Sequence, residues 1–519
     1  MSRTYDVNDG SVVVVIGSGA GGGTLSNELA QQGIDVVCLE AGARLSLADF
    51  RNDEPAMAAK FNWTDPREGS GEMSPTRPTY ICKTVGGTTT HWTALALRMA
   101  PHEIRGRTSY GAIAGTELID WPLDYDELSH FYGLAEAKMG VTGTNGIPRH
   151  PANNNFKLLN AGAMKLGYPR SETANLAINS VARDGRGPCQ QLGFCRSGCV
   201  VAAKWSTLYT EIPKAEATGH FELRPESMVT AIEQEADGRV SAVLYRNRDG
   251  ELVRQKARAI AVAGNAIETA RLLLQSTSVL SPDGLGNQNG LVGRHYMRHV
   301  FGRVLARMPG KVNMYRGIVQ AGSLEHEAHH DPARGFASGY HIETVSMSPE
   351  GVARTLMPQE GWGESFADAM EAYEYYAGAI ICGEDFPQAS NRVTLHDSRT
   401  DQYGLPIPKI HYEKNENSRA MLEHAFGVVE NIYGALDAEK IYRTPSGTAT
   451  HNMGTARMAA DEKEGVCNSN GSVFGVPNLF ITDGSAFPTS MTANPTLTIV
   501  ALAIRQAGFI RQSMVERAI

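Results

Sequence analysis

A glycine-rich turn between two apolar runs is the feature that most limits how this chain can fold. Residues 11–16 read SVVVVI, a β-branched run that is typical of a strand buried in a parallel sheet. The turn GSGAGGG follows, then the helical stretch TLSNELAQQG and a second apolar run, IDVVCLEAG. This order predicts a βαβ unit at the start of an α/β fold with a Rossmann-like sheet.

Gly17, Gly19 and Gly22 give the turn a G-x-G-x-x-G pattern. The first glycine allows a tight turn, the second lets the backbone approach a pyrophosphate, and the third lets the helix pack closely on the strand. Glu40 closes the next strand, 18 residues after Gly22, where a carboxylate can accept hydrogen bonds from a ribose. This chemistry by itself fits both NAD and FAD.

Two further segments favour FAD. Residues 85–93 read VGGTTTHWT, and paired glycines with a run of hydroxyls suit a backbone that passes close to a flat ring or a phosphate. Near the C-terminus a strand ends in LFITDGS, and a proline opens the last helix, whose free N–H groups can face a flavin carbonyl. The candidate contacts in these segments are Gly86, Gly87, His91, Trp92, Thr93, Asp483, Gly484, Pro495 and Thr496.

The nucleotide-binding patterns lie at both ends and in the middle of the chain, so the FAD-binding domain is expected to be discontinuous. We expect it to comprise residues 1–100, 201–300 and 441–519. Residues 101–200 and 301–440 would form an α+β substrate-binding domain on a mixed or antiparallel sheet, with a cysteine-rich loop at 185–200. Residues 46–80 read as an irregular loop or lid.

Composition excludes several classes of function. The 519 residues carry 48 basic and 56 acidic side chains, a net charge of -8, which argues against a nucleic-acid-binding protein. No apolar run is long enough to span a membrane, and the N-terminal residues lack the pattern of an export signal, so we expect a cytoplasmic protein. Seven cysteines, an odd number, argue against a disulfide scaffold.

Several blocks of this sequence, in order, are GGTTTHW, AGNAIETARLLLQS, GLGNQNGLVGRHYMRH, HNMGTARM and NLFITDGSAFPTSMTANPTLTI. With the βαβ unit they resemble the glucose–methanol–choline (GMC) oxidoreductases, which are FAD-dependent. The resemblance implies that Gly17, Gly19, Gly22 and Glu40 hold the ADP part and that Val229 contacts the adenine. Asp483 and Gly484 would lie near the pyrophosphate and ribityl chain, and Asn494, Pro495 and Thr496 by the isoalloxazine. His295 and His299 would share a helix face, and the resemblance implies a structural role for them.

His451 opens the HNMGTARM block, and Asn494 follows 43 residues later. The resemblance implies that they form the catalytic pair that faces the flavin. Oxidation of an alcohol needs a base for the hydroxyl proton and a path for hydride to flavin N5. A neutral histidine can accept that proton near pH 7, and an asparagine amide can orient the hydroxyl without a change in charge.

The stretch Thr90-His91-Trp92-Thr93 resembles that of pyranose oxidases, in which the histidine is covalently joined to FAD. Related sugar dehydrogenases share the His-Trp dipeptide. Covalent and non-covalent binding therefore both stay open.

Cys189, Cys195 and Cys199 lie in GPCQQLGFCRSGC, and three close thiolates suit a soft metal centre. No fourth ligand for zinc is evident. The spacing resembles that in bacterial membrane-linked sugar dehydrogenases and implies a [3Fe-4S] cluster; free thiols in a structural loop are the alternative.

The sequence thus predicts an FAD-dependent enzyme that oxidises a hydroxyl of a small sugar, glycoside or polyol and passes electrons to a non-NAD acceptor. An oxidase that makes hydrogen peroxide and a non-redox relative such as a hydroxynitrile lyase are the alternatives. The resemblance implies a small subunit or an electron-transfer partner. A periplasmic location would follow if that partner carried the export signal.

Overall fold

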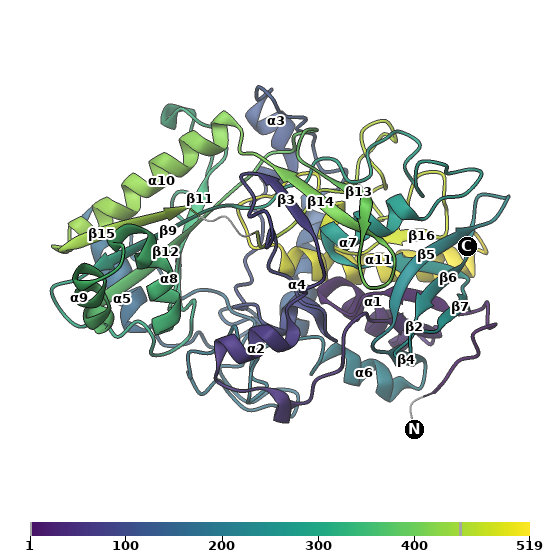
Figure 1. The fold of residues 1–519 in the computed structure, drawn as a ribbon, viewed down its shortest axis with the longest axis horizontal. Helices are drawn as coiled ribbons and strands as arrows, with labels where there is room; N and C mark the ends of the chain where they lie inside the picture. The colour runs from purple at the N-terminus through teal and green to yellow at the C-terminus, as the bar shows by residue number, and fades with distance from the viewer. Residues whose placement is uncertain (1–2, 446–448) are drawn as a thin grey trace.

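The structure, a computed structural model, describes residues 3–445 and 449–519 (Figure 1). Its central layer is a parallel five-stranded sheet in the order β16-β8-β1-β2-β4. The strands come from distant parts of the chain: β1 (Val13–Ile16), β2 (Val36–Leu39), β4 (Phe221–Arg224), β8 (Ala259–Val262) and β16 (Leu479–Ile481). The sheet confirms the predicted α/β fold with a discontinuous Rossmann-like sheet.

Each face of this sheet is covered, which explains why β1 and β2 are apolar throughout. Val13 and Val15 face one core with the helices α1 (Ala20–Gln31), α6 (Glu211–Thr218) and α11 (Thr496–Val515). Val14 and Ile16 face a second core, which includes the antiparallel layer β5 (Met228–Gln234), β6 (Val240–Arg246) and β7 (Leu252–Lys256) and the helix α7 (Asn265–Gln275). The helix α4 (Tyr125–Met139) packs on α11.

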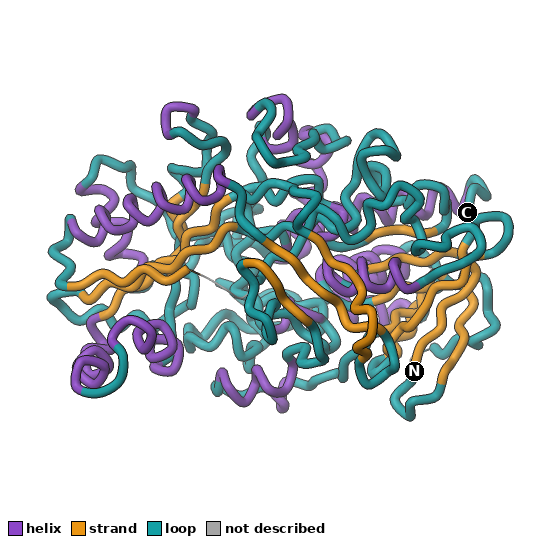
Figure 2. The backbone as a smooth tube through the Cα atoms, turned by 45° about the horizontal axis from the view of Figure 1, so that its top comes forward, coloured by secondary structure: helices purple, strands orange, loops and turns teal. Residues whose placement is uncertain are grey.

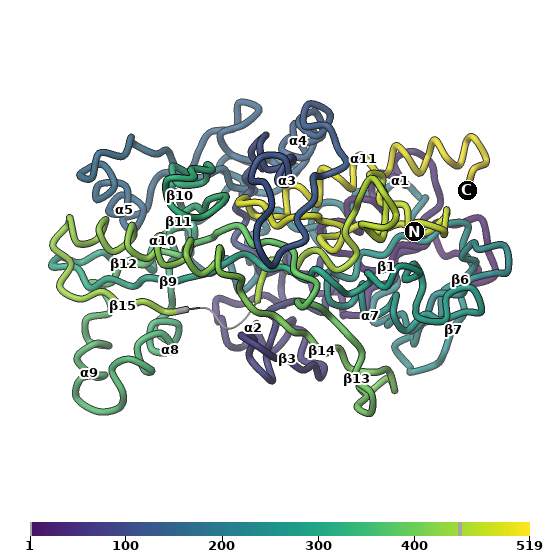
Figure 3. The backbone as a smooth tube through the Cα atoms, turned by 90° about the horizontal axis from the view of Figure 1, so that it is seen from above, coloured from purple at the N-terminus to yellow at the C-terminus, as the bar shows by residue number. Residues whose placement is uncertain are grey.

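A second, antiparallel sheet lies at the other end of the molecule, as Figures 1 and 2 show, in the order β10-β11-β12-β9-β15. Its strands are β9 (Val300–Arg307), β10 (Ser323–Leu324), β11 (Tyr340–Thr344), β12 (Tyr376–Gly383) and β15 (Lys440–Pro445). The helices α5 (Asn154–Lys165) and α10 (Glu416–Gly434) pack against it, and α8 (Pro349–Glu360) and α9 (Glu364–Glu371) lie beside β15 (Figure 3). The predicted antiparallel sheet is therefore present.

A three-stranded sheet joins segments from the two predicted domains. β13 (Arg392–Thr400) pairs with β14 (Pro406–Tyr412), and β14 pairs in parallel with β3 (Glu68–Gly71). The segment expected to be irregular, 46–80, thus contains β3 and also the helix α2 (Glu54–Phe61), which Asp53 caps. A short helix, α3 (Gly106–Tyr110), precedes α4. The stretch before β9 is not helical, so His295 and His299 do not have the shared face that a helix would give them.

Across residues 3–445 and 449–519, none of the helices combines the length and the apolar character that a membrane crossing requires.

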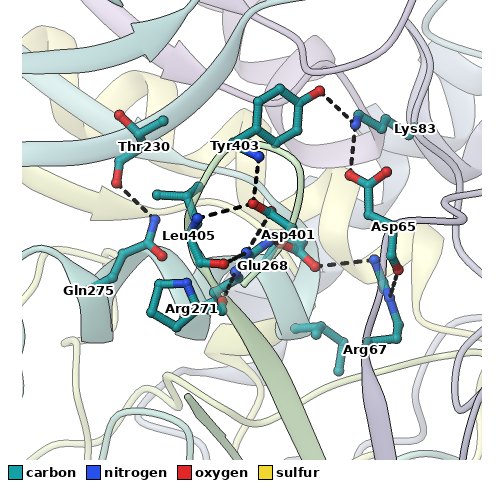
Figure 4. Close-up of polar contacts among 12 residues, drawn as sticks. Asp65, Arg67, Lys83, Thr230, Glu268, Arg271, Gln275, Asp401, Tyr403 and Leu405 are labelled. Atoms are coloured by element: carbon teal, nitrogen blue, oxygen red, sulfur yellow. Dashed lines mark hydrogen bonds and ion pairs between the residues drawn. The ribbon is translucent and has the colours of Figure 1, made fainter. Parts of the chain in front are cut away.

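A buried network of ion pairs holds β3, α7 and the β13–β14 turn together (Figure 4). Arg271 of α7 binds Asp401 at 2.7 Å and Glu268 at 3.2 Å, and Glu268 also lies 3.4 Å from Arg67. All four side chains are less than a tenth exposed. A broken buried pair leaves an uncompensated charge, so the network fixes how these three segments pack.

We expect Asp401→Ala to lower the free energy of unfolding by about 3–5 kcal/mol, because Arg271 loses its best partner in a buried site. The exposed Asp397 of β13 has no polar partner in the described chain and gives a matched control. Asp397→Ala should change stability by less than about 0.5 kcal/mol. Thermal unfolding of both variants measures this; equal midpoints would contradict the role of the network.

Candidate active site

One cavity of about 560 Å³ runs from the carboxyl ends of the parallel strands to a face of the antiparallel sheet. This edge is where open α/β sheets bind ligands. Most of the residues singled out from the sequence line it: Gly17, Gly19, Glu40, Gly87, His91, Trp92, Thr93, Val229, His451, Asp483, Gly484, Asn494, Pro495 and Thr496. Gly22 and Gly86 lie behind the wall, and Cys189, Cys195 and Cys199 lie outside it.

The glycine turn leaves no room for side chains at several positions, of which Gly17 and Gly22 belong to the G-x-G-x-x-G pattern. A Cβ on Gly17, which has φ +99°, would lie 2.4 Å from the Ala263 carbonyl oxygen, and one on Gly22 would lie 2.0 Å from the Gly17 oxygen. A Cβ on Gly19 would meet nothing nearer than the Cα of Gly87, at 3.9 Å, so its open side faces the cavity. Two glycine turns thus form a backbone cradle at the start of α1, the arrangement that suits a pyrophosphate.

The two acidic residues at this end are held by neutral donors. Glu40 accepts hydrogen bonds from the Ser18 hydroxyl at 2.7 Å and the Gly42 amide at 2.9 Å. Asp483 accepts from the Thr269 hydroxyl at 2.6 Å and also caps the turn that follows β16. Burial raises the pKa of both carboxyls. Two oxygens with four lone-pair sites leave Glu40 able to accept from a ribose as well.

His451 is held by a second histidine, His299, at the opposite end of the cavity. The two Nδ1 atoms are 2.8 Å apart, and His299 Nε2 lies 3.0 and 2.8 Å from the carbonyl oxygens of Ser490 and Met491. A carbonyl only accepts, so His299 Nε2 carries a proton. Burial is the main cause that lowers the pKa of His299 to about 4, so its ring is neutral and its Nδ1 accepts.

This arrangement fixes the tautomer of His451. Cys382 Sγ also lies 3.2 Å from His299 Nδ1, but the contact between the two imidazoles is shorter, at 2.8 Å. In that bond His451 Nδ1 carries the proton that it donates to His299, so its Nε2 keeps a lone pair. Nε2 has no hydrogen-bond partner within the described chain, and the side chain lines the cavity. Burial and the neighbouring His299 and His341 lower the pKa of His451 well below its usual range, so the ring is neutral at pH 7.

Asn494 is oriented by a carboxylate. Its Nδ2 donates to Glu343 Oε1 at 2.9 Å, while its Oδ1 is buried without a partner. Glu343 also accepts from His341 at 2.7 Å and from Gln320. Burial opposes a charge on His341, but the bond and charge of Glu343 raise its pKa overall. The amide therefore keeps an oxygen without a protein partner and one N–H beyond the one that bonds Glu343.

These partners were not found from the sequence. The family resemblance implies a structural role for His299. Glu343 and His341 lie in residues 301–440, where the sequence predicts no site residue. Two sets of ligand-type atoms within 4.8 Å of one another occur in the described chain, and both contain Cys382: one with His299 and His451, the other with His341 and Glu343. The hydrogen bonds described above already involve all four of these neighbours of Cys382.

His91 lies on the cavity wall. Its ring stacks on Tyr80, with centroids 4.4 Å apart, and its Nδ1 is 3.3 Å from Cys82 Sγ. Burial, with the positive charges of Lys204 and Arg196, lowers the pKa of His91 to about 3. The imidazole is therefore neutral over the physiological range.

The cysteine loop is joined to this wall by a buried lysine. Lys204 is 1% exposed, and its Nζ donates to backbone carbonyls of Thr90, Trp92 and Cys195, at 3.0, 2.7 and 2.5 Å. Burial lowers its pKa to about 8, and the nearby thiols oppose that shift. All three cysteines of the loop are free and partly buried. In the part of the chain that the structure describes, their sulfurs are not among the sets of ligand-type atoms that lie within 4.8 Å of one another.

Comparison with known proteins places the chain in a family. The N-terminal model of the GMC oxidoreductases matches residues 40–301, and the C-terminal model matches residues 387–503. The 2-methyl-1,2-propanediol dehydrogenase of Mycolicibacterium austroafricanum is 32% identical over 98% of this chain and 96% of its own length. The fructose dehydrogenase large subunit of Gluconobacter japonicus is 28% identical over 96% and 97%.

Two further comparisons agree with this. The paromamine 6'-oxidase of Streptomyces fradiae is 30% identical over 97% of this chain and 92% of its own length. A crystal structure of pyridoxine 4-oxidase from Mesorbium loti has a TM-score of 0.71 and 17% identity, covering 96% of this chain and 99% of the other. The last match shows the shared fold.

Gly19→Val should give a folded protein that retains little FAD, because the new side chain meets open space in the protein and enters the cavity. The flavin absorbance per protein after gel filtration and the melting temperature of flavin-free protein measure the two effects. Gly310→Val, at an exposed glycine with nothing within 4 Å, is the control and should keep its flavin. Full flavin occupancy in Gly19→Val would contradict the cradle.

Proposed function

Because the chain belongs to the GMC oxidoreductase family, we propose that it oxidises a hydroxyl of a sugar, glycoside or polyol to the carbonyl, with His451 as the base. The protein is an FAD-dependent oxidoreductase that acts on CH–OH donors. The observation that carries the assignment of the base is the hydrogen bond between His299 and His451, which leaves one free lone pair in the cavity.

The residues present fit FAD. A Cβ-free cradle lies at the start of α1, a buried carboxylate follows β2, and Asp483 and Gly484 line the stretch between this cradle and His451. Gly17, Gly19, Glu40 and Val229 would hold the ADP part, and Asn494, Pro495 and Thr496 would lie by the isoalloxazine. Bound FAD supplies the hydride acceptor, at N5.

His451 and Asn494 offer the substrate two acceptors. The lone pair on His451 Nε2 takes the proton of the hydroxyl that is oxidised, and Nδ1 stays bonded to His299 throughout. The Asn494 amide has an Oδ1 without a protein partner and one N–H that is not bonded to Glu343, so it needs further polar groups from the substrate. A neighbouring hydroxyl on the same molecule meets this need, which supports a sugar or polyol over a simple alcohol.

Electrons then pass to an acceptor other than NAD. A [3Fe-4S] cluster on Cys189, Cys195 and Cys199 stays a prediction; in its favour, buried Lys204 offers a positive charge to thiolates and joins the loop to the flavin-side turn. One relative is named as the large subunit of fructose dehydrogenase, and a partner subunit for this chain stays a prediction. Oxygen is the alternative acceptor, and the oxidase names among the relatives support it.

Anaerobic addition of sugars and polyols should bleach the flavin bands of the purified enzyme. In His451→Ala we expect FAD to stay bound and the rate of bleaching to fall by at least about 100-fold, the lower range of general-base catalysis. His130→Ala, at an exposed histidine on α4, is the matched control. Flavin reduction at an unchanged rate in His451→Ala would contradict the assignment of His451 as the base.

His299→Leu should slow flavin reduction about 10-fold or more, because His451 loses the acceptor that fixes its tautomer. His299→Gln keeps an acceptor and a donor, so it should recover much of the rate. The pH profile separates positioning from folding: wild type should stay active below pH 6.5, because the lowered pKa of His451 keeps the base neutral there. If His299→Leu kept both the wild-type rate of flavin reduction and the wild-type pH dependence below pH 6.5, the positioning role would be wrong.

Covalent attachment at His91 stays a prediction, supported by a neutral ring on the cavity wall. If the link is present, acid precipitation leaves the yellow colour in the pellet, and His91→Ala moves that colour to the supernatant. Colour that washes out of the wild-type pellet would reject the link and leave FAD bound by contacts alone.

A further inference from the structure

Three neighbouring strands of the antiparallel sheet present one row of side chains to the cavity. Glu343 of β11 pairs with Ile380 of β12, and Ile380 pairs with Arg303 of β9. Directly paired residues point to the same face of a sheet, and all three line the cavity. Two strand spacings of ~4.8 Å place Glu343 and Arg303 about 10 Å apart on one wall.

This row lies next to the reacting end. Phe301, two residues before Arg303 on β9, has its ring centroid 5.2 Å from that of His451. Two residues of a strand cover ~6.6 Å. Arg303 and His451 therefore lie close enough for one small molecule to contact both.

Arg303 has no acidic partner in the described chain. Its Nη1 makes a long bond of 3.4 Å to the Thr355 hydroxyl, and its Nε is buried with no partner. The strand opposite, β15, places Thr444 beside it. A guanidinium with free donors on a cavity wall is poised to bind an acceptor from outside the protein.

Arg196 brings a second positive charge to this end of the cavity. It comes from the cysteine loop and lines the same wall, and its Nη2 donates to the Ser346 carbonyl at 3.2 Å. Glu54 lies 3.7 Å from its Nε, but that carboxylate also accepts a 2.8 Å bond from Ser348. Burial and the charge of Arg196 together lower the pKa of Arg303 to about 10, so Arg303 remains charged at pH 7.

The other acidic groups of the cavity do not balance these charges. Glu343 is bound by His341, whose raised pKa favours the charged form, and by the amides of Gln320 and Asn494. Glu268 is paired with Arg67 and Arg271, and Glu40 and Asp483 lie with the glycine cradle. The substrate end therefore carries an excess of positive charge.

We propose that Arg303 and Arg196 bind an anionic group of the substrate, a carboxylate or a phosphate. The substrate would then be a sugar acid, a uronic acid or a sugar phosphate, with the oxidised hydroxyl one sheet row from the anion. Both oxyanions match the planar donor fork of arginine. This inference rests on the proposed function, since it names the class of substrate for the same cavity.

The test compares three probes on the holoenzyme under anaerobic conditions: D-glucose, D-glucuronate and D-glucose 6-phosphate. Ligand-dependent stabilisation in thermal unfolding gives the half-saturating concentration of each. We expect at least one anion to saturate at a concentration at least tenfold lower than glucose does, and the better anion tells carboxylate from phosphate. In Arg303→Gln this advantage should vanish.

Arg307→Gln is the matched control, because Arg307 lies on the same strand, pairs with Glu439 at 3.0 Å and does not line the cavity. It should keep the anion preference. Glucose that binds as tightly as both anions, or a preference that survives in the double variant Arg196→Gln/Arg303→Gln, would overturn the inference.

Flavin bleaching by the same probes and by neutral polyols separates this inference from the proposed function. Bleaching by neutral polyols without any preference for anions overturns the inference and leaves the function standing. Anion binding through Arg303 with no bleaching by any sugar, sugar acid or polyol overturns the function and leaves the site standing.

Discussion

The cavity depends on backbone contacts so close that no side chain fits between them. Gly17 lies against the carbonyl of Ala263, Gly22 lies against Gly17, and a Cβ on Gly21 would lie 1.7 Å from the Thr482 carbonyl oxygen. These contacts hold α1 against segments from the start, the middle and the end of the chain. The same segments also carry residues that line the cavity. The close packing at these glycines therefore fixes where the lining residues lie.

The charged side chains at the two ends of the cavity have different hydrogen-bond partners. At the cofactor end, neutral hydroxyl and amide donors hold Glu40 and Asp483, which leaves these carboxylates as acceptors. At the substrate end, Glu343 is fully engaged by protein donors, while the guanidinium of Arg303 is not. Buried polar groups are normally paired, so an unpaired donor on a cavity wall is best explained by a ligand that completes it.

Local patterns predicted three residues that the structure brings to one cavity wall. Gly17, Gly19 and Glu40 lie within one βαβ unit, where the spacing of glycines and a carboxylate follows from strand and helix geometry. The placement of His451 and Asn494 on one cavity followed from the family resemblance. His299 could not be found in this way, because the stretch before β9 is irregular and its partner is 152 residues away. Arg303 and Glu343 were missed because strand register, which places them in one row, is set by contacts between distant segments.

The two sheets therefore divide the chemistry between them. The parallel sheet and its glycine turns supply mostly backbone groups, which would hold a cofactor whose shape does not change from one substrate to another. The antiparallel sheet supplies side chains in rows, and each row can change without a change in the backbone that carries it. A substitution at Arg303 alters one position of the row but leaves the bond between His299 and His451 intact. His299 sets the tautomer of the base, and we expect Arg303 to set the choice of substrate. The two properties therefore depend on different residues of one cavity.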